Sequence, residues 1–359
     1  MAPVLPPARI IDPASVPALN WGAIGNGWIV RLFTEALHAH TRQRIRAVAG
    51  RNAGRAAAFA AELGIDRAHE SPQALVADPA IDVVYVGTPH SSHREMALLA
   101  IAAGKHVLVE KPLALSAEEG REIASAARAA GVFVMEAMWT RYLPQSDIIR
   151  QLLADGALGD VDLVMADFGF VAAFDPAGRM WDPAVGGGAL LDAGVYPLSF
   201  ASSVLGAPSR ITASGAMTTT GVDARAVVQL TAAGGANAVV ATSMVSALPV
   251  RASIVGSAGR IDIPTPFFGP SGVVLTLGSI GSEDTASWTD DRFKTMHEGL
   301  SDQANALASY VAEGRTESPL HPLDEAVTVL GTIDEVRRQV ASQDDAARGA
   351  GTPGSESGV

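Results

Sequence analysis

The sequence of 359 residues contains no cysteine, which excludes disulfides, thiol nucleophiles and zinc or iron–sulfur centres ligated by cysteine. Basic residues are also fewer than acidic ones. Lys and Arg together number 26 against 38 Asp and Glu, and the formal net charge of -12 argues against nonspecific binding to nucleic acid or anionic membranes. No segment approaches the roughly 18 to 20 uninterrupted apolar residues that a membrane span requires. We therefore expect a small-molecule substrate, with no nucleic-acid and no membrane partner.

Lysine is especially rare, since the chain has only Lys105, Lys111 and Lys294. Lys111 follows an apolar run, residues 106–109, and stands between Glu110 and Pro112. A lysine at the tip of a buried strand, in a chain that otherwise prefers arginine, indicates a specific role. The alternative is a lysine that merely extends its stem from a strand end to solvent.

Both ends of the chain differ from the rest. Residues 1–18 contain prolines where a signal peptide would need a basic start and an unbroken apolar run. We expect them to form an extended arm, and we expect the protein to be cytoplasmic. Residues 343–359 are rich in Gly, Ser and charge without periodicity, which predicts a flexible tail.

The hydrophobic pattern changes at about residue 139. Between 19 and 138, short apolar runs alternate with Ala-rich helical stretches, which predicts an α/β Rossmann domain with a doubly wound parallel sheet. Its expected strands are 19–24, 44–49, 81–87, 106–109 and 132–138. From 139 to 329 successive apolar runs with few helices predict an α+β domain on a mostly antiparallel sheet. A C-terminal helix is expected over 330–342.

A glycine-rich turn joins the first expected strand to the first expected helix. Gly25 would allow a tight turn and Gly27 would let the backbone approach a pyrophosphate, while the helix that starts near Trp28 would direct its free N–H groups at that anion. Val30 stands where the usual G-x-G-x-x-G/A pattern ends, so helix and strand should lie slightly farther apart. Glycines are common at such turns, but this position in a strand–helix series favours a dinucleotide site.

The second expected strand ends where the adenosine ribose of a dinucleotide would lie. An NAD-selective site usually has an Asp or Glu there, whereas this chain has Arg51 and Arg55. One guanidinium can stack on the adenine while both oppose a 2′-phosphate. The alternative is a pair of solvated arginines at a helix start. We predict NADP as the cofactor, with NAD less favoured.

Polar segments also follow three neighbouring strands, at residues 88–90, 110–112 and 136–141. In doubly wound sheets ligands lie outside the carboxyl ends of the strands. Lys111 should therefore face the reactive end of the cofactor.

Five segments in this order, GAIGNGWI, TPHSSH, EKPLALS, EAMWTRYLP and GGGALLDAGVYP, resemble the Gfo/Idh/MocA family of NAD(P)-dependent oxidoreductases. Within it the chain is most similar to the branch that contains dimeric dihydrodiol dehydrogenase, NADP-dependent D-xylose dehydrogenase and glucose-fructose oxidoreductase. The resemblance covers most of the chain. It implies a second domain whose open sheet commonly pairs subunits, so a homodimer or larger homo-oligomer is expected.

The resemblance also implies that Lys111 lies beside nicotinamide and substrate, and that Asp192 and Tyr196 complete the active site. These two residues are four apart and on a helix share one face. The implied reaction moves hydride between the nicotinamide and a hydroxyl-bearing carbon of a sugar, polyol or trans-dihydrodiol, with Tyr196 exchanging the proton. Lys111 and an oxidised nicotinamide would lower the pKa of this phenol from about 10. The structural alternative is a helix-start Asp and a core Tyr.

The remaining expectations concern binding residues and other functions. The motifs together predict cofactor contacts from Gly25, Asn26, Gly27, Trp28, Ile29, Arg51, Arg55, Thr88, His90, His93, Glu110 and Lys111. Substrate contacts are expected from Trp139, Arg141 and Phe168, although packing explains each equally well. The eight histidines are scattered, so we expect no metal. Two alternatives stay open: a nucleotide-binding sensor without turnover, and an enzyme whose tightly held cofactor shuttles between two sugars.

Overall fold

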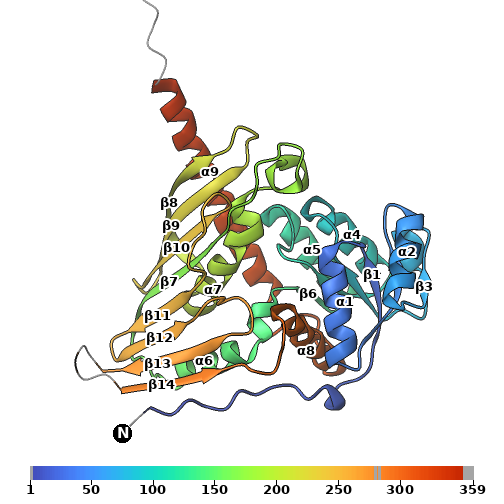
Figure 1. Ribbon diagram of the computed structural model, residues 1–359, viewed down its shortest axis with the longest axis horizontal. Coiled ribbons are helices and arrows are strands. Elements are labelled where there is room, and N and C mark those ends of the chain that lie inside the picture. Colours follow the sequence, from blue (N-terminus) through green and yellow to red (C-terminus); the bar gives the residue numbers. More distant parts are fainter. Residues whose placement is uncertain (1–2, 279–280, 282–283, 351–359) are drawn as a thin grey trace, which may run out of the picture.

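The computed structural model describes residues 3–278, 281 and 284–350. Two sheets lie side by side in two domains, the parallel sheet on the right and the larger sheet on the left in Figure 1. The fold class predicted from the sequence is confirmed. The N-terminal segment runs along the second domain, where Arg9 forms an ion pair of 2.8 Å with Asp147.

The first domain is built on six parallel strands in the order β3-β2-β1-β4-β5-β6. Its elements are β1 (Asn20–Ile24), α1 (Trp28–His40), β2 (Arg44–Ala49), α2 (Ala53–Leu63), β3 (Arg67–Ala68), α3 (Pro72–Val76), β4 (Val83–Val86), α4 (His93–Ala102), β5 (His106–Val109), α5 (Ala117–Ala130) and β6 (Val134–Glu136). β2 and β5 have the predicted bounds, whereas β3 and α3 lie outside the predicted elements. Strand β4 is buried throughout, as expected for a parallel strand covered on both faces. The carboxyl ends of β1, β4 and β5 meet at one edge.

The second domain carries eight strands in the order β14-β13-β12-β11-β7-β10-β9-β8. They are β7 (Val161–Gly169), β8 (Pro208–Met217), β9 (Asp223–Ala232), β10 (Asn237–Ser243), β11 (Ala252–Gly256), β12 (Gly259–Ile263), β13 (Gly272–Leu277) and β14 (Asp284–Thr289). Neighbours are antiparallel except β7 and β10, which run parallel. The sheet is therefore mostly antiparallel, as predicted.

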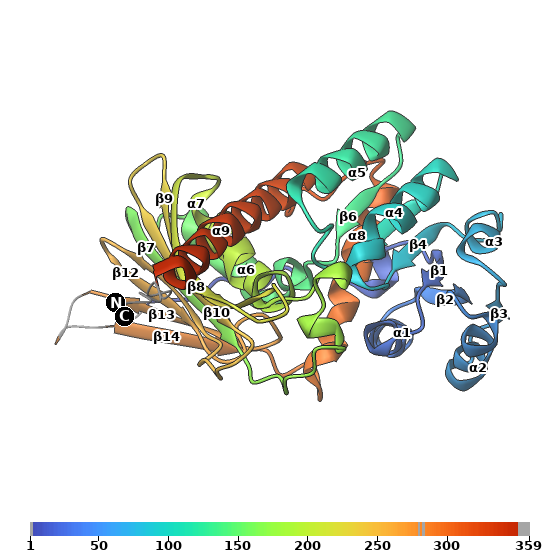
Figure 2. The same ribbon diagram turned by 90° about the horizontal axis from the view of Figure 1, so that it is seen from above.

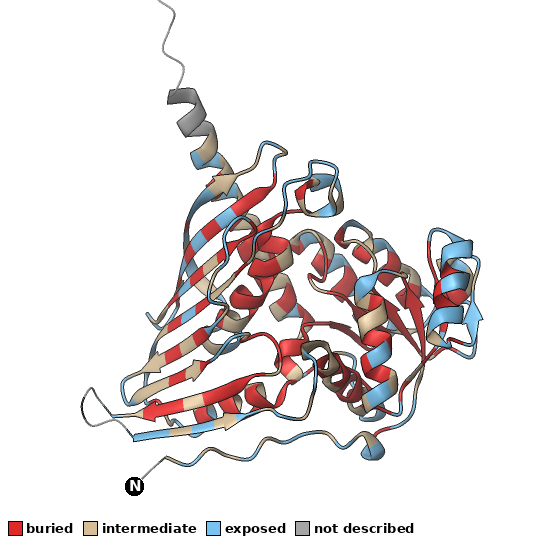
Figure 3. Cartoon of the chain, in the orientation of Figure 1, coloured by how far each residue is buried: buried red, intermediate tan, exposed pale blue. Residues whose placement is uncertain are grey.

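In the part of the chain that the structure describes, helices cover one face of this sheet and leave the other uncovered. α6 (Pro144–Ala154), α7 (Val195–Leu205) and α9 pack on it, as Figure 2 shows, and α8 (Leu300–Ala312) packs on α1 of the first domain. Buried and exposed residues alternate along the central strands (Figure 3), so every second side chain lies on the opposite face of the sheet, where Met165, Val227 and Val239 are exposed. This open face is apolar at its centre.

Helix α9 (Leu323–Ala350) joins the two domains. It contacts β8 in the second domain and α5 in the first, where Asp334 accepts a hydrogen bond of 2.9 Å from the backbone of Ala117. The helix begins before the predicted residue 330 and continues past 342. Residues 343–350, predicted as part of a flexible tail, are helical because Ala and Arg there favour helix. Residues 351–359 of that predicted tail lie outside the described residues.

One apolar stretch, Pro183–Leu205, has the length and mean hydropathy, 1.2, of a membrane span, but 72% of its window is buried inside the protein. It contains a π-helical turn, Leu190–Gly194, followed by α7, which contacts β7, β10 and α9. Its apolar composition is explained by this position in the core.

Candidate active site

The ammonium group of Lys111 lies beside the turn that precedes α7. Its Nζ donates a hydrogen bond of 2.7 Å to the backbone oxygen of Asp192 and lies 3.7 Å from Asp192 Oδ1. The same Nζ is 5.0 Å from the centre of the Tyr196 ring. Lys111 belongs to the first domain and the other two residues to the second. The fold thus brings the three predicted catalytic residues together.

The turn that carries Asp192 is an irregular helix start. The 5 residues before α7 form a π-helical turn, a local widening of the helix. Asp223, a buried carboxylate on β9, anchors this turn by accepting hydrogen bonds of 2.6 Å from the Leu190 backbone and 3.2 Å from Arg337. Gly188 allows the approach, since a Cβ there would lie 2.5 Å from Asp223 Oδ1 and φ is 114°. The position of Asp192 therefore depends on β9 and α9.

The ring of Tyr196 is enclosed by aromatic side chains from separate segments. Its centre lies 4.9 Å from that of Phe268 and 5.7 Å from that of Phe168. The indole N–H of Trp139 donates a hydrogen bond of 3.1 Å to the phenol oxygen. Two of the residues predicted as substrate contacts, Trp139 and Phe168, are thus beside the phenol. Phe268 lies outside the predicted set, because a phenylalanine in the loop between β12 and β13 follows no periodic pattern.

The charge state of the candidate pair, Lys111 and Tyr196, is set by burial and by neighbouring charged groups. Burial raises the pKa of Tyr196, Lys111 lowers it and Glu110 raises it again, so that it stands above its usual value of 10. Lys111 therefore has the predicted effect, but burial outweighs it in the protein alone. For Lys111 burial acts to lower the pKa, but Tyr196 and the carboxylates of Asp192 and Glu110 raise it above 10.5. At neutral pH the pair is a phenol and an ammonium.

Asp192 is a carboxylate surrounded by cations and dipoles. Burial acts to raise its pKa, but Lys111, Arg179 and His90 lower it below 3.8. Both terminal nitrogens of Arg179 donate to Asp192 Oδ1 over 3.4 Å. His90 Nδ1 donates a hydrogen bond of 3.0 Å to the backbone oxygen of Gly186, and burial lowers the pKa of His90 to about 3, so its ring is neutral at neutral pH. Asp192 is thus positioned to hold the charge of Lys111.

Glu110, the residue before Lys111, is buried next to β4. The hydroxyl of Tyr85 donates a hydrogen bond of 2.6 Å to its carboxylate. Burial raises the pKa of Glu110 to about 7, although the Tyr85 hydrogen bond and Lys111 act in the opposite direction. The negative charge beside Lys111 therefore changes within the neutral pH range.

His93, at the start of α4, connects two loops of the site. Its Nδ1 lies 2.7 Å from the carbonyl oxygen of Pro112, and its Nε2 lies 3.0 Å from that of Thr88. Both oxygens are acceptors, so both contacts are hydrogen bonds only when both ring nitrogens carry hydrogen. Burial lowers the pKa of His93 and opposes that state, while the two carbonyls favour it. His93 thus ties the end of β4 to the loop that carries Lys111.

The turn between β1 and α1 has the form of a nucleotide-binding loop. Gly27 caps the 13-residue helix α1, and a Cβ at Gly27 would meet no atom within 4 Å, so the free N–H groups of the helix start are open to an anion. Val30 is buried and fits because the facing residue is Gly87, where a Cβ would lie 2.4 Å from Val30 Cγ2. The small residue that the usual pattern places on the helix, where this chain has Val30, is therefore found on the facing side, as Gly87 at the end of β4.

The other predicted cofactor residues surround this turn. Trp28 is 65% exposed, and Asn26 and Ile29 are half-buried. Arg51, just after β2, and Arg55, in the first turn of α2, are exposed, and their guanidinium groups have no hydrogen-bond or ion-pair partner among residues 3–278, 281 and 284–350. The hydroxyl of Thr88 is buried without a hydrogen-bond partner. An open helix start and an unpartnered buried hydroxyl fit a bound nicotinamide nucleotide.

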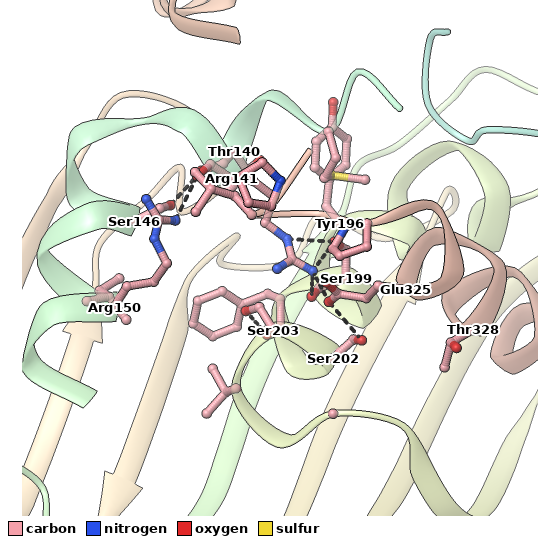
Figure 4. A pocket seen from close by; sticks show the side chains of 18 of the residues that line it. Thr140, Arg141, Ser146, Arg150, Tyr196, Ser199, Ser202, Ser203, Glu325 and Thr328 are labelled. Atoms are coloured by element: carbon pink, nitrogen blue, oxygen red, sulfur yellow. Dashed lines mark hydrogen bonds and ion pairs between the residues drawn. The ribbon is translucent and has the colours of Figure 1, made fainter. Parts of the chain in front are cut away.

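Arg141, the third predicted substrate contact, points toward a different cavity (Figure 4). Its guanidinium donates a hydrogen bond of 2.8 Å to the backbone oxygen of Ser199 and pairs with Glu325 at 2.5 Å. This cavity of about 480 Å³ lies between α6, α7 and the start of α9, and of the three catalytic candidates only Tyr196 reaches its wall. A contact between Arg141 and substrate stays a prediction. Across the described part of the chain, no group of three metal-ligating side chains is found.

Known proteins and family models match most of this chain. A family model described as "Oxidoreductase family, NAD-binding Rossmann fold" matches residues 19–138, and the "GFO/IDH/MocA C-terminal domain" matches residues 147–262. Trans-1,2-dihydrobenzene-1,2-diol dehydrogenase from Mus musculus is 35% identical over 327 residues, which cover 90% of this chain and 97% of that protein. The Danio rerio enzyme of the same name is 38% identical over 330 residues, with 90% and 97% covered.

Solved structures agree with this match. KijD10, a 3-ketoreductase from Actinomadura kijaniata in complex with NADP and TDP-benzene, superimposes with a TM-score of 0.77 and 26% identity, covering 90% of this chain and 98% of that one. Levoglucosan dehydrogenase in complex with NADH has the same fold, with a TM-score of 0.83, 20% identity and coverage of 91% and 98%. Both domain models and near full-length relatives match this sequence, and the chain belongs to the GFO/IDH/MocA family of NAD(P)-binding oxidoreductases.

Proposed function

We propose that the protein is an NADP-dependent oxidoreductase that transfers hydride between the nicotinamide and a hydroxyl-bearing carbon of a sugar, polyol or trans-dihydrodiol. The observation that carries the proposal is the convergence of Lys111, Asp192 and Tyr196 from two domains, with Lys111 Nζ 5.0 Å from the Tyr196 ring. Relatives named for a diol dehydrogenase and a similar structure named for a sugar ketoreductase support these substrate classes.

In this proposal Tyr196 exchanges the proton of the substrate oxygen. A bound nicotinamide nucleotide supplies or accepts the hydride. Because the pKa of Tyr196 is raised, the phenol is protonated at neutral pH and carries the proton that the reductive direction requires. In the oxidative direction it must first lose that proton, which the neighbouring ammonium of Lys111 favours. Asp192 keeps Lys111 in place through its backbone oxygen and its carboxylate.

The substrate would lie against the aromatic side chains around Tyr196. Phe168 and Phe268 are stacked with ring centres 4.4 Å apart, and Trp139 lies edge-on to Phe268 at 6.2 Å. Such faces suit the ring of a dihydrodiol or the C–H face of a sugar. The hydrogen bond from Trp139 keeps the phenol oxygen oriented beside them.

The choice of NADP is supported by Arg51 and Arg55. Arg51 lies just after β2 and Arg55 in the first turn of α2, where the adenosine ribose would lie; both are exposed, and no described carboxylate pairs with them. Two free guanidinium groups match the geometry and charge of a 2′-phosphate. The open helix start at Gly27 matches the pyrophosphate.

The proposal includes a homodimer, formed through the open face of the second sheet, and a cytoplasmic location. The dimer is supported by the exposed apolar residues Met165, Val227 and Val239 on adjacent central strands. The location is supported by the cofactor, because a nicotinamide nucleotide that dissociates from the enzyme requires an intracellular pool of that nucleotide.

The proposal is tested by incubating the protein with NADP and a panel of sugars, polyols and dihydrodiols while the absorbance of reduced cofactor is followed. Tyr196→Phe and Lys111→Ala should each lower turnover about a hundredfold or more. Tyr310→Phe and Lys294→Ala, outside the site, serve as matched controls. Binding of NADP without turnover of any substrate would favour a sensor, and NADP retained through gel filtration would favour a shuttle between two sugars.

A further inference from the structure

His297 lies at the junction of the two domains. It belongs to the short helical turn Met296–Gly299, which precedes α8. Its ring is 5.0 Å from that of Trp28 in an edge-to-face contact and 6.4 Å from that of Trp139 in a nearly parallel one, at 18°. Trp28 belongs to the proposed cofactor turn, and Trp139 holds the phenol oxygen of Tyr196. His297 is therefore near the reacting groups without touching Lys111 or Tyr196.

The backbone at His297 is held firmly in place. Thr295 and Glu298 form a capping box around the turn, and Glu298 also pairs with His40 at the far end of α1, at 3.0 Å. A Cβ at Gly299 would lie 3.1 Å from Trp139, so the turn is packed directly against the indole. A side chain on such a support is positioned before any ligand arrives.

The imidazole of His297 differs from the other histidines near the site in its hydrogen bonding. His90 and His93 both use ring nitrogens on backbone carbonyls. The ring of His297 is half-buried, yet within the described ranges it has no hydrogen-bond partner. Burial lowers its pKa, so at neutral pH the ring is neutral and offers one donor and one acceptor. A hydroxyl group complements both.

We propose that His297 binds a substrate hydroxyl remote from the reacting carbon and thereby selects hydroxyl-rich sugars and polyols over aromatic dihydrodiols. This inference rests on the proposed function. The rings of Trp139 and Phe268 form part of the aromatic wall around Tyr196, which suits both substrate classes. A dihydrodiol has only its two adjacent hydroxyls, whereas a sugar carries further hydroxyls that can reach His297.

The test compares kcat/KM for D-xylose with kcat/KM for trans-1,2-dihydrobenzene-1,2-diol in wild type, His297→Phe and His297→Gln. The phenylalanine keeps a ring against Trp139 but has no donor or acceptor, so the sugar-to-diol ratio should fall about three- to tenfold, the usual effect of one neutral hydrogen bond. Glutamine keeps a donor and an acceptor and should restore part of the ratio. His69→Asn, remote from the site, is the matched control.

Several outcomes would overturn the inference. One is an equal change for both substrates, and another is a change confined to the KM for NADP, which would assign His297 to the cofactor. If His297→Phe has a lowered unfolding midpoint, His297→Leu, which also lacks a donor and an acceptor, replaces it, and an unchanged ratio in Leu overturns the inference as well. If the wild type turns over neither substrate class, the proposed function itself fails and the inference falls with it.

Discussion

The two domains build their parts of the site in different ways. In the first domain the contributing residues lie in the turns and helix starts that follow parallel strands. Glu110 and Lys111 follow β5 directly, and Glu110 accepts a hydrogen bond from Tyr85 on the neighbouring strand β4. In the second domain Asp192 and Tyr196 depend on β9, α9 and loops far away in the sequence. A parallel sheet gathers its strand ends at one edge by topology alone, whereas a mostly antiparallel sheet needs long-range packing to assemble the same density of functional groups.

The first prediction tests the close packing of helix α1 against the end of β4 in the first domain, and it has the largest expected effect. Gly87→Ala should lower the free energy of unfolding by about 3 kcal/mol, because its Cβ would lie 2.4 Å from Val30 Cγ2 in a close-packed core. Urea unfolding measures the change. Gly54→Ala, whose Cβ would meet only Asn52 Oδ1 at 3.4 Å, is the control. The double variant with Val30→Ala should recover stability; if it does not, the clash is not the cause.

The second prediction concerns the ionisation of Glu110, the residue before Lys111. The pKa of Glu110 is raised to about 7, so its folded state prefers the proton, and the wild type loses stability as pH rises from about 4.5 to about 7. Glu110→Gln cannot ionise and should gain about 2 kcal/mol relative to wild type between pH 5 and pH 8. Unfolding midpoints at several pH values measure this. Glu118→Gln, exposed on α5, should show no such trend, and a flat difference for Glu110→Gln would contradict the assignment.

The third prediction separates the cofactor part of the site from the substrate part. Arg51→Ala and Arg55→Ala should each raise the KM for NADP about tenfold, as the loss of a charged hydrogen bond would, while the KM for NAD and the turnover number change little. Initial rates with both cofactors measure this. Arg121→Ala, exposed on α5, is the control. Michaelis constants of wild type that favour NAD tenfold would refute the choice of NADP.

The fourth prediction addresses the open face of the second sheet and has the smallest expected effect on catalysis. Val227→Lys should convert the proposed dimer to a monomer, because a charge at the centre of an apolar interface is costly to bury. Light scattering after gel filtration measures the mass, and turnover should change less than about threefold, since the catalytic groups lie on the opposite side. Ile10→Lys, on the N-terminal arm, should leave the mass unchanged.

Much of the fold was predictable because its signals are local. β2 and β5 have the predicted bounds, since short apolar runs between helical stretches leave little freedom of interpretation. The second sheet was predicted as mostly antiparallel, but no sequence pattern showed that β7 and β10 run parallel. The C-terminal helix is longer than predicted because its apolar stripe begins at Leu323, where it packs on both domains.

The sequence by itself determined the two-domain fold, the glycine turn and the lysine at the end of β5, because these depend on neighbours along the chain. Only the tertiary structure decided the surroundings of Tyr196. It brought Phe268 and His297 toward the phenol and turned Arg141 to Glu325 instead. It also showed that burial outweighs Lys111 in setting the pKa of the phenol. The physical reason is that desolvation and ring packing depend on every segment that reaches the site, whatever its distance in sequence.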